Sequence, residues 1–255
     1  MKSKSLITKL AKRFPKRIGA RRDFLGIQIN KLPEEINKIM LALDFDYEVY
    51  EHMLKEKPDL VLTHHPFIYG TFMRVKNSSP EKSKLIDMML ENGTPIYSMH
   101  TNFDAGKDGM NDALAERLGL VNVHPLIGEP MGRGGELKEE MDPVSFAKMA
   151  KEKFEVNNGW LINAGSKTIK SVAIIGGAGW YDYKVAKAEG YDIFISGDIP
   201  HHGRRDIIME QYNYLDLPHE IEKIFVHQMK KILLEIDPTL KVDIIDHEEL
   251  PELIK

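Results

Sequence analysis

Short apolar segments that end in polar, histidine-bearing turns alternate with helical segments along this chain. A buried strand is expected at 36–44, a helix that ends before Pro58 follows it, and residues 59–63 form a second apolar strand. A strand, a helix and a strand within about 30 residues are typical of a βαβ unit with a parallel pair. The pattern therefore predicts an α/β chain built of βα units.

The same alternation continues to the end of the chain. A short N-terminal helix is indicated by Leu6, Leu10 and Phe14 at helical spacing, and Gly93 is expected to end a helix. Further strands are expected at 95–100, 171–177, 191–198 and 242–246, and further helices at 83–93, 111–120, 144–154, 181–190 and 220–236. The stretch 128–143 is rich in glycine and charge, so it reads as a linker or exposed loop. A linker there would divide the chain into two lobes, 1–127 and 128–255. Alternatively, the two halves form one interlocked domain.

Composition excludes several classes of site. The 255 residues are 42% apolar and 29% charged, which is typical of a globular protein, and the net charge of −4 argues against general nucleic-acid binding. The chain has no cysteine, so disulfides, thiolate zinc sites, iron–sulfur clusters and a cysteine nucleophile are excluded. Any metal must be bound by His, Asp or Glu. No long apolar segment predicts a membrane span or a signal peptide, and we expect a cytoplasmic protein.

Histidines are concentrated where predicted strands end. Five of the ten histidines lie at or just after such an end: His64, His65, His100, His201 and His202. Open α/β sheets place their ligand sites at the carboxyl ends of the strands. Imidazoles and carboxylates together bind zinc, iron and manganese. The strand ends are therefore candidate metal sites.

The pair His64–His65 has more than one interpretation. Adjacent side chains on an extended backbone point to opposite sides, so the pair serves two metals, or one metal if the strand ends and twists there. Alternatively, one histidine caps the strand and the other lies on the surface. Asp104 follows His100 in a glycine-containing loop and is favoured as a ligand. Asp108 and Asp112 are favoured as turn and cap residues instead.

The second half of the chain carries weaker signals. His219 and Glu222 are three residues apart, which suits a two-ligand unit on a helix but also an ordinary charged first turn. Arg204 and Arg205 suit an anionic substrate or, more simply, a solvated helix face. The segment 176–179 (GGAG) lacks a phosphate-loop pattern and is interpreted as a tight turn after a strand. Residues 59–63 and 192–196 are a weak internal echo, from duplication or from two similar βα units.

Four segments, in this order, resemble the NIF-three-like dinuclear-metal family, whose members are often named GTP cyclohydrolase 1 type 2 homologues. They are LVLTHHPFIYG, YSMHTNFDAGKDGMNDALAERLGL, DIFISGDIPHH and DLPHEIEKI. The resemblance extends from about Phe14 to Met229. Two departures stand out: Pro218 replaces a common glycine, and the N-terminal Trp/Asp/Asn-rich segment is present only as RRDFLGIQI. The contacts of that segment are therefore open.

The resemblance implies a NIF-three-like fold of two α/β lobes and a toroidal homohexamer. It implies two divalent metal ions per chain, such as zinc, iron or manganese. The family's metal ligands correspond to His64, His65, Asp104, His219 and Glu222. His100 and His202 match motif positions near the metals, and we expect one of them to carry protons in catalysis.

These features predict a metal-dependent hydrolase that acts on a nucleotide-like or cyclic-amide substrate, with no membrane partner. The alternative is a non-catalytic metal-binding protein that acts as a hexameric scaffold, a metal store or a regulator. A third hypothesis, nucleic-acid binding, rests on the basic N-terminal residues Lys9, Lys12, Arg13, Lys16, Arg17, Arg21 and Arg22. A solvated helix face is the favoured interpretation of those residues.

Overall fold

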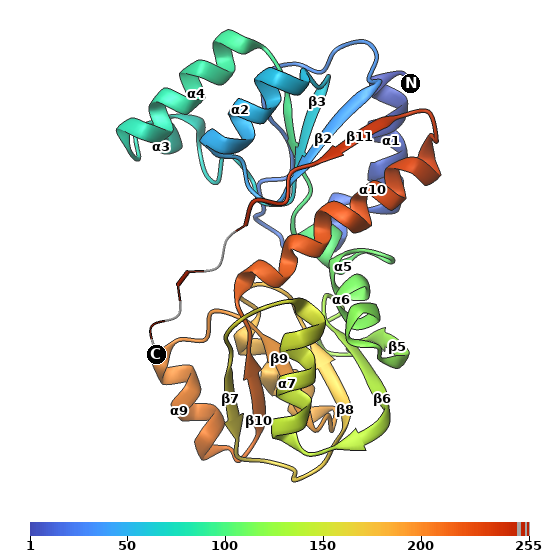
Figure 1. The fold of residues 1–255 in the computed structure, drawn as a ribbon, viewed down its shortest axis with the longest axis vertical. Coiled ribbons are helices and arrows are strands. Elements are labelled where there is room, and N and C mark those ends of the chain that lie inside the picture. The colour runs from blue at the N-terminus through green and yellow to red at the C-terminus, as the bar shows by residue number, and fades with distance from the viewer. Residues whose placement is uncertain (249–250, 253, 255) are drawn as a thin grey trace. The chain divides into compact units, whose positions relative to one another are not determined.

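The protein is described by a computed structural model that covers residues 1–248, 251, 252 and 254. It forms two compact units. Unit 1 comprises Met1–Lys107 and Phe225–Glu248, and unit 2 comprises Asp108–Ile224 with the described residues beyond 248. Each unit has one sheet with helices packed on it, which confirms the α/β class (Figure 1). The division at residue 127 remains a prediction about domains, and the compact units divide the chain elsewhere.

The sheet of unit 1 has the strand order β1-β4-β3-β2-β11. Parallel strands β2 (Lys38–Ala42), β3 (Leu60–Thr63) and β4 (Ile96–Ser98) form its centre, with β11 (Lys241–Ile244) parallel beside β2. Strand β1 (Gly26–Ile29) is antiparallel to β4. All four residues of β3 are buried, as expected for a strand covered on both faces. The expected strands around 36–44, 59–63 and 95–100 are therefore present.

Helices of unit 1 begin and end at the expected signals. In α4 (Pro80–Asn92), the Ser79 hydroxyl accepts a hydrogen bond from the Lys82 N–H, Pro80 occupies the first turn, and Gly93 ends the helix at φ +83°. The other helical elements are α1 (Ser3–Arg13), η1 (Lys16–Ile18), α2 (Tyr47–Glu56), α3 (Phe72–Lys76), α5 (Thr101–Ala105) and α10 (Ile224–Ile236). Helix α1 confirms the short N-terminal helix.

The sheet of unit 2 has the order β5-β6-β8-β9-β10-β7. Its strands are β5 (Val121–Pro125), β6 (Arg133–Met141), β7 (Trp160–Asn163), β8 (Ile169–Ile174), β9 (Ile193–Ser196) and β10 (Asn213–Asp216). Its helical elements are α6 (Met110–Leu118), α7 (Pro143–Phe154), η2 (Trp180–Asp182), α8 (Tyr183–Ala188), α9 (His201–Met209) and η3 (His219–Lys223). Strands β8, β9 and β10 are mutually parallel, whereas β7 is antiparallel to β10.

Both sheets contain the same arrangement of four strands. In unit 1, β2, β3 and β4 are parallel neighbours in chain order, and β1, which precedes them, lies antiparallel beside β4. In unit 2, β8, β9 and β10 are the parallel neighbours, and the preceding strand β7 lies antiparallel beside β10. The weak echo between residues 59–63 and 192–196 thus falls on equivalent strands, β3 and β9.

The prediction that residues 128–143 form a linker or exposed loop is wrong. Most of this stretch is β6, which pairs with both β5 and β8. Gly134 and Gly135 let the Tyr191 side chain and the Val121 backbone approach where a Cβ would collide or crowd. Arg133 is buried, and its guanidinium pairs with the Asp112 carboxylate. Glycine and charge, which indicated a loop, here serve close packing and a buried ion pair.

The structure also bears on the expected absence of a membrane span and on the basic N-terminal residues. Among the described residues, none of the helices is long and apolar enough to cross a membrane. The basic N-terminal residues are partly engaged within unit 1, because Arg13 pairs with Glu235 at 2.8 Å and the Lys9 and Lys16 ammonium groups donate to backbone carbonyls. Nucleic-acid binding by these residues was the less favoured hypothesis, and the contacts give it no support.

Candidate metal-binding groups

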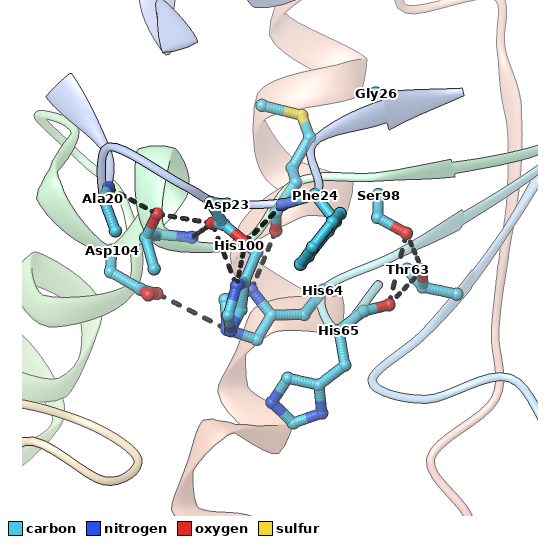
Figure 2. A network of polar contacts seen from close by, with 12 residues as sticks. Ala20, Asp23, Phe24, Gly26, Thr63, His64, His65, Ser98, His100 and Asp104 are labelled. Carbon is cyan, nitrogen blue, oxygen red and sulfur yellow. Dashed lines mark hydrogen bonds and ion pairs between the residues drawn. The ribbon is translucent and has the colours of Figure 1, made fainter. Parts of the chain in front are cut away.

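The first group of candidate ligands follows β3 and β4 in unit 1. Beyond Thr63 the chain bends, and the His65 carbonyl accepts hydrogen bonds from the hydroxyls of Thr63 (2.8 Å) and Ser98 (3.2 Å). Figure 2 shows this network with the rings of His64, His65 and His100 beside it. One ligand atom from each of these three histidines lies within 4.8 Å of the others. The bend therefore favours the alternative in which the neighbouring histidines face one site.

His64 lies in an apolar surrounding that strengthens any electrostatic contact it makes. Its side chain is fully buried, and its ring centroid is 5.2 Å from that of Phe225 and 6.4 Å from that of Phe103. The Oδ1 atom of Asp104, on α5, is 3.5 Å from His64 Nε2 (Figure 2). A buried imidazole and carboxylate at this separation, shielded from water by aromatic rings, suit a divalent ion.

The Nδ1 atom of each histidine in this group is occupied by a hydrogen bond. The acceptors are the Met99 carbonyl for His64 (2.8 Å), Asp44 for His65 (2.7 Å) and Asp23 for His100 (2.9 Å). An Nδ1–H donated to a carbonyl or carboxylate fixes the neutral tautomer and turns the Nε2 lone pair toward the site. This is the arrangement that metal-binding histidines generally show.

Asp23 is a site residue that the sequence reasoning missed. Its carboxylate is only 3% exposed and accepts hydrogen bonds from the His100 ring, from the backbone N–H groups of Phe24 and Thr101, and from the Thr101 hydroxyl (Figure 2). Burial opposes ionisation, but the hydrogen bonds from His100 and Thr101 outweigh it and hold the pKa of Asp23 well below its ordinary range. Within the segment 21–29, Asp23 is thus the residue that contacts and orients His100.

The second group lies in unit 2, after β9 and β10. His219 and Glu222 lie in the 3₁₀ helix η3 instead of the first turn of the expected α-helix, and α10 starts only at Ile224. Residues three apart are eclipsed in a 3₁₀ helix, and Glu222 Oε2 lies 3.1 Å from His219 Nε2. Asp198, which follows β9, accepts the His219 Nδ1–H at 2.6 Å. His219 thus shares the pattern of the first group.

A glycine turn after β8 makes room for Glu222. A Cβ on Gly177 would lie 2.6 Å from Glu222 Oε1 and 3.2 Å from His219 Nε2, and the φ of Gly177 is +61°. The turn is anchored because the Gly177 carbonyl accepts from Gly197 N–H (2.8 Å) and Ser196 Oγ (3.0 Å). The interpretation of 176–179 as a tight turn is confirmed, and its glycines serve the His219–Glu222 pair.

The remaining sequence candidates have other contacts. His202 lies in the first turn of α9, is exposed, and packs edge-on against Trp180 with ring centroids 5.5 Å apart. A catalytic role for His202 stays a prediction, as does one for His100. Asp108 lies in a turn, as expected, but the N-cap of α6 is Gly109 and not Asp112. Asp112 instead accepts the Asp108 N–H at 2.6 Å and pairs with Arg133.

Comparison with known proteins identifies the family. A profile described as Duf34/NIF3 (NGG1p interacting factor 3) matches residues 1–251. The chain belongs to the Duf34/NIF3 family. It is 31% identical over 252 residues to the "GTP cyclohydrolase 1 type 2 homolog" of Methanocaldococcus jannaschii, which covers 96% of this chain and 98% of that protein. A protein of the same name in Streptococcus pneumoniae serotype 4 is 30% identical over 226 residues, or 86% of this chain and 85% of that protein.

Solved structures have the same fold as this chain. A Bacillus cereus protein related to NIF3 superposes with a TM-score of 0.90 at 20% identity and covers 100% of this chain and 99% of its own. Reduced HcgD from Methanocaldococcus jannaschii gives a TM-score of 0.79 at 28% identity, with 96% of this chain and 98% of that chain covered. The sequence resemblance to the NIF-three-like family is therefore confirmed.

We expect Gly177→Ala to destabilise this Duf34/NIF3 protein by roughly 2–4 kcal/mol, since strain at positive φ adds to a collision with Glu222. Gly190→Ala is the matched control, because Gly190 has φ +85° and open space around the position of a Cβ. It should cost only about 1 kcal/mol. Urea unfolding measures both. If Gly177→Ala and Gly190→Ala lost equal free energy of unfolding, the close approach of Gly177 to Glu222 would not matter for stability.

Asp23→Asn should lower the free energy of unfolding by about 1–3 kcal/mol at pH 7, because a buried charged acceptor of several N–H and O–H groups is lost. The stabilisation from a lowered carboxylate pKa is complete above the ordinary value of 3.8 and is lost as the pH falls below it. The difference between the two proteins should therefore shrink only below about pH 4. Asp44→Asn, at a carboxylate that is 49% exposed, is the control and should cost less.

Proposed function

We propose that this protein binds two divalent metal ions per chain and hydrolyses a nucleotide-like or cyclic-amide substrate with them. The observation that carries the proposal is shared by the three histidines proposed as ligands. The Nδ1 atom of each is hydrogen-bonded to a carbonyl or carboxylate oxygen: His64, His65 and His219. Histidines that bind metals almost always have their other ring nitrogen hydrogen-bonded in this way.

The proposed ligands are those that the family resemblance implies. Unit 1 supplies His64, His65 and Asp104, and unit 2 supplies His219 and Glu222. The set consists of three imidazoles and two carboxylates, which suits zinc, iron or manganese. Both carboxylates are largely buried, with Asp104 8% and Glu222 3% exposed, so each gains from a cation as partner.

The proposed catalytic roles fall to the same groups of residues. Divalent ions held by these ligands would lower the pKa of bound water and polarise a substrate oxygen. The Asp23 carboxylate holds the Nδ1 of His100 and orients its ring, so that Nε2 can take up and release a proton. Phe103 and Phe225 exclude water around His64. His202 is the second candidate proton carrier.

The substrate class rests on the relatives' names and on the chemistry of the ligands. Proteins similar to this chain carry the name GTP cyclohydrolase 1 type 2 homolog, which supports a nucleotide-like substrate. Hydrolysis of a cyclic amide requires an activated water and a proton donor for the leaving nitrogen, and the proposed roles supply both. We also propose the toroidal homohexamer that the resemblance implies, which light scattering tests against the 29.2 kDa chain.

Elemental analysis of the full chain, purified without chelating resin, tests the metal proposal. We expect two metal ions per chain and their loss in His64→Ala and in Glu222→Ala, because each variant removes a ligand. His201→Ala, at an exposed histidine that also follows a strand, should keep both ions. No metal after anaerobic reconstitution with iron, zinc and manganese would exclude this ligand set.

Turnover is tested on a panel of nucleotides and cyclic amides. His100→Ala should keep its metal and lose most of the turnover, on the order of a hundredfold or more, as expected for a general acid–base. Full turnover in His100→Ala would move the proton-carrying role to His202. Metal binding with no turnover on any substrate would support the non-catalytic scaffold or storage protein instead.

A further inference from the structure

A pocket in unit 2 adjoins one of the proposed metal ligands. It has a volume of about 280 Å³ and lies where β9 and β10 end and β7 begins. The side chains that matter for its chemistry are Trp160, Asp198, Arg204, Asp216, His219 and Glu220. Because His219 forms part of the wall, a molecule in the pocket lies directly beside this proposed metal-binding residue. Its size is close to the lower limit of ligand pockets, about 300 Å³, and suits one ring or two fused rings.

At the equivalent place in unit 1, a side chain of the protein contacts a site histidine. Gly26 of β1 pairs with Ser98 at the end of β4, and Trp160 of β7 pairs with Asp216 at the end of β10. In unit 1 the residues just before β1 include Asp23, whose buried carboxylate bonds His100. In unit 2 the residues just before β7 are Asn158 and Gly159, and they line a cavity. The same strand arrangement thus carries a buried Asp23–His100 contact in unit 1 and a cavity in unit 2.

Trp160 gives this pocket a flat aromatic wall. Its side chain is 64% exposed, although large aromatic side chains are normally buried. The guanidinium carbon of Arg204 lies 5.3 Å from the centroid of the indole, and Arg204 Nη2 contacts Asp216 Oδ2 at 3.3 Å. Asp216 therefore holds the guanidinium plane next to the indole. Two such planar groups favour a flat, unsaturated ring as the occupant.

Charge decides which kind of ring fits. The pocket presents the carboxylates of Asp198, Asp216 and Glu220 against the single guanidinium of Arg204, which Asp216 already pairs. An anionic group such as a phosphate is repelled by this excess of negative charge. Groups with N–H bonds are attracted, since carboxylates only accept hydrogen bonds.

We infer that this pocket binds a planar, uncharged nitrogen heterocycle through stacking on Trp160 and through N–H groups that donate to its carboxylates. The inference rests on the proposed function in one respect: the ring is then the aromatic part of the substrate, seated beside His219. Any phosphate of the substrate lies outside the pocket.

The binding test uses the full-length chain with Trp180→Phe. Of the two tryptophans in the sequence, this variant keeps only Trp160. Two probes share a flat purine skeleton: guanosine carries N–H donors on its ring edge, and caffeine carries none. We expect guanosine to quench Trp160 saturably and to bind at least tenfold more tightly than caffeine. Equal affinities would overturn the donor requirement, and the absence of saturable quenching would overturn the site.

Variants separate this site from the metal site. Asp216→Asn should weaken guanosine binding about tenfold, and Trp160→Leu should abolish it in calorimetry. Tyr181→Leu removes another exposed aromatic residue, 59% exposed, and should leave binding unchanged. Guanosine binding that survives in the metal-depleted His64→Ala protein shows that the ring pocket acts by itself. Normal metal content without guanosine binding would refute the pocket and leave the metal proposal intact.

Discussion

The hydrogen bond at Nδ1 of each site histidine is the interaction on which the candidate metal groups depend. A histidine after a strand can rotate freely unless one ring nitrogen is held, and a rotating ring loses entropy when it binds. Here the holding groups differ in kind: a backbone carbonyl for His64, and carboxylates for His65, His100 and His219. Each acceptor comes from a separate segment of its unit, so the fold of that unit must form before the rings are oriented.

The repeated strand arrangement explains why the candidate metal ligands of unit 1 and those of unit 2 occupy equivalent positions, although the residues differ. Polar residues follow β3 and β4 in unit 1 and the equivalent β9 and β10 in unit 2. Parallel strands bring their carboxyl ends to one edge of the sheet, where side chains meet without interrupting the hydrogen-bonded ladder. In unit 1 this edge carries imidazoles, and in unit 2 it carries an imidazole with carboxylates. The arrangement therefore determines the place, and the residues after each strand determine the chemistry.

Sequence reasoning succeeded where one short segment carried the whole signal. The strands β3 and β9 are apolar up to their last residue, and His64 and His65 follow the first directly, so both strand and candidate ligands were evident. It failed where the meaning of a residue depends on a distant partner. Asp23 is one aspartate among basic residues until His100, 77 positions away, is placed beside it. Strand β6 looked like a loop because its glycines and Arg133 are explained only by Tyr191 and Asp112.

The same dependence on distant partners links packing to chemistry in unit 2. Gly177 offers no side-chain atom that could bind a metal. Its lack of a Cβ nevertheless leaves the space in which Glu222 Oε2 lies 3.1 Å from His219 Nε2. The Gly177 carbonyl in turn accepts the N–H of Gly197, next to Asp198, which holds His219. The turn at Gly177, the end of β9 and the 3₁₀ helix η3 thus contact one another. A change in any of these elements therefore affects the positions of His219 and Glu222. Conformation at a glycine is therefore part of the candidate metal site as much as the donor atoms are.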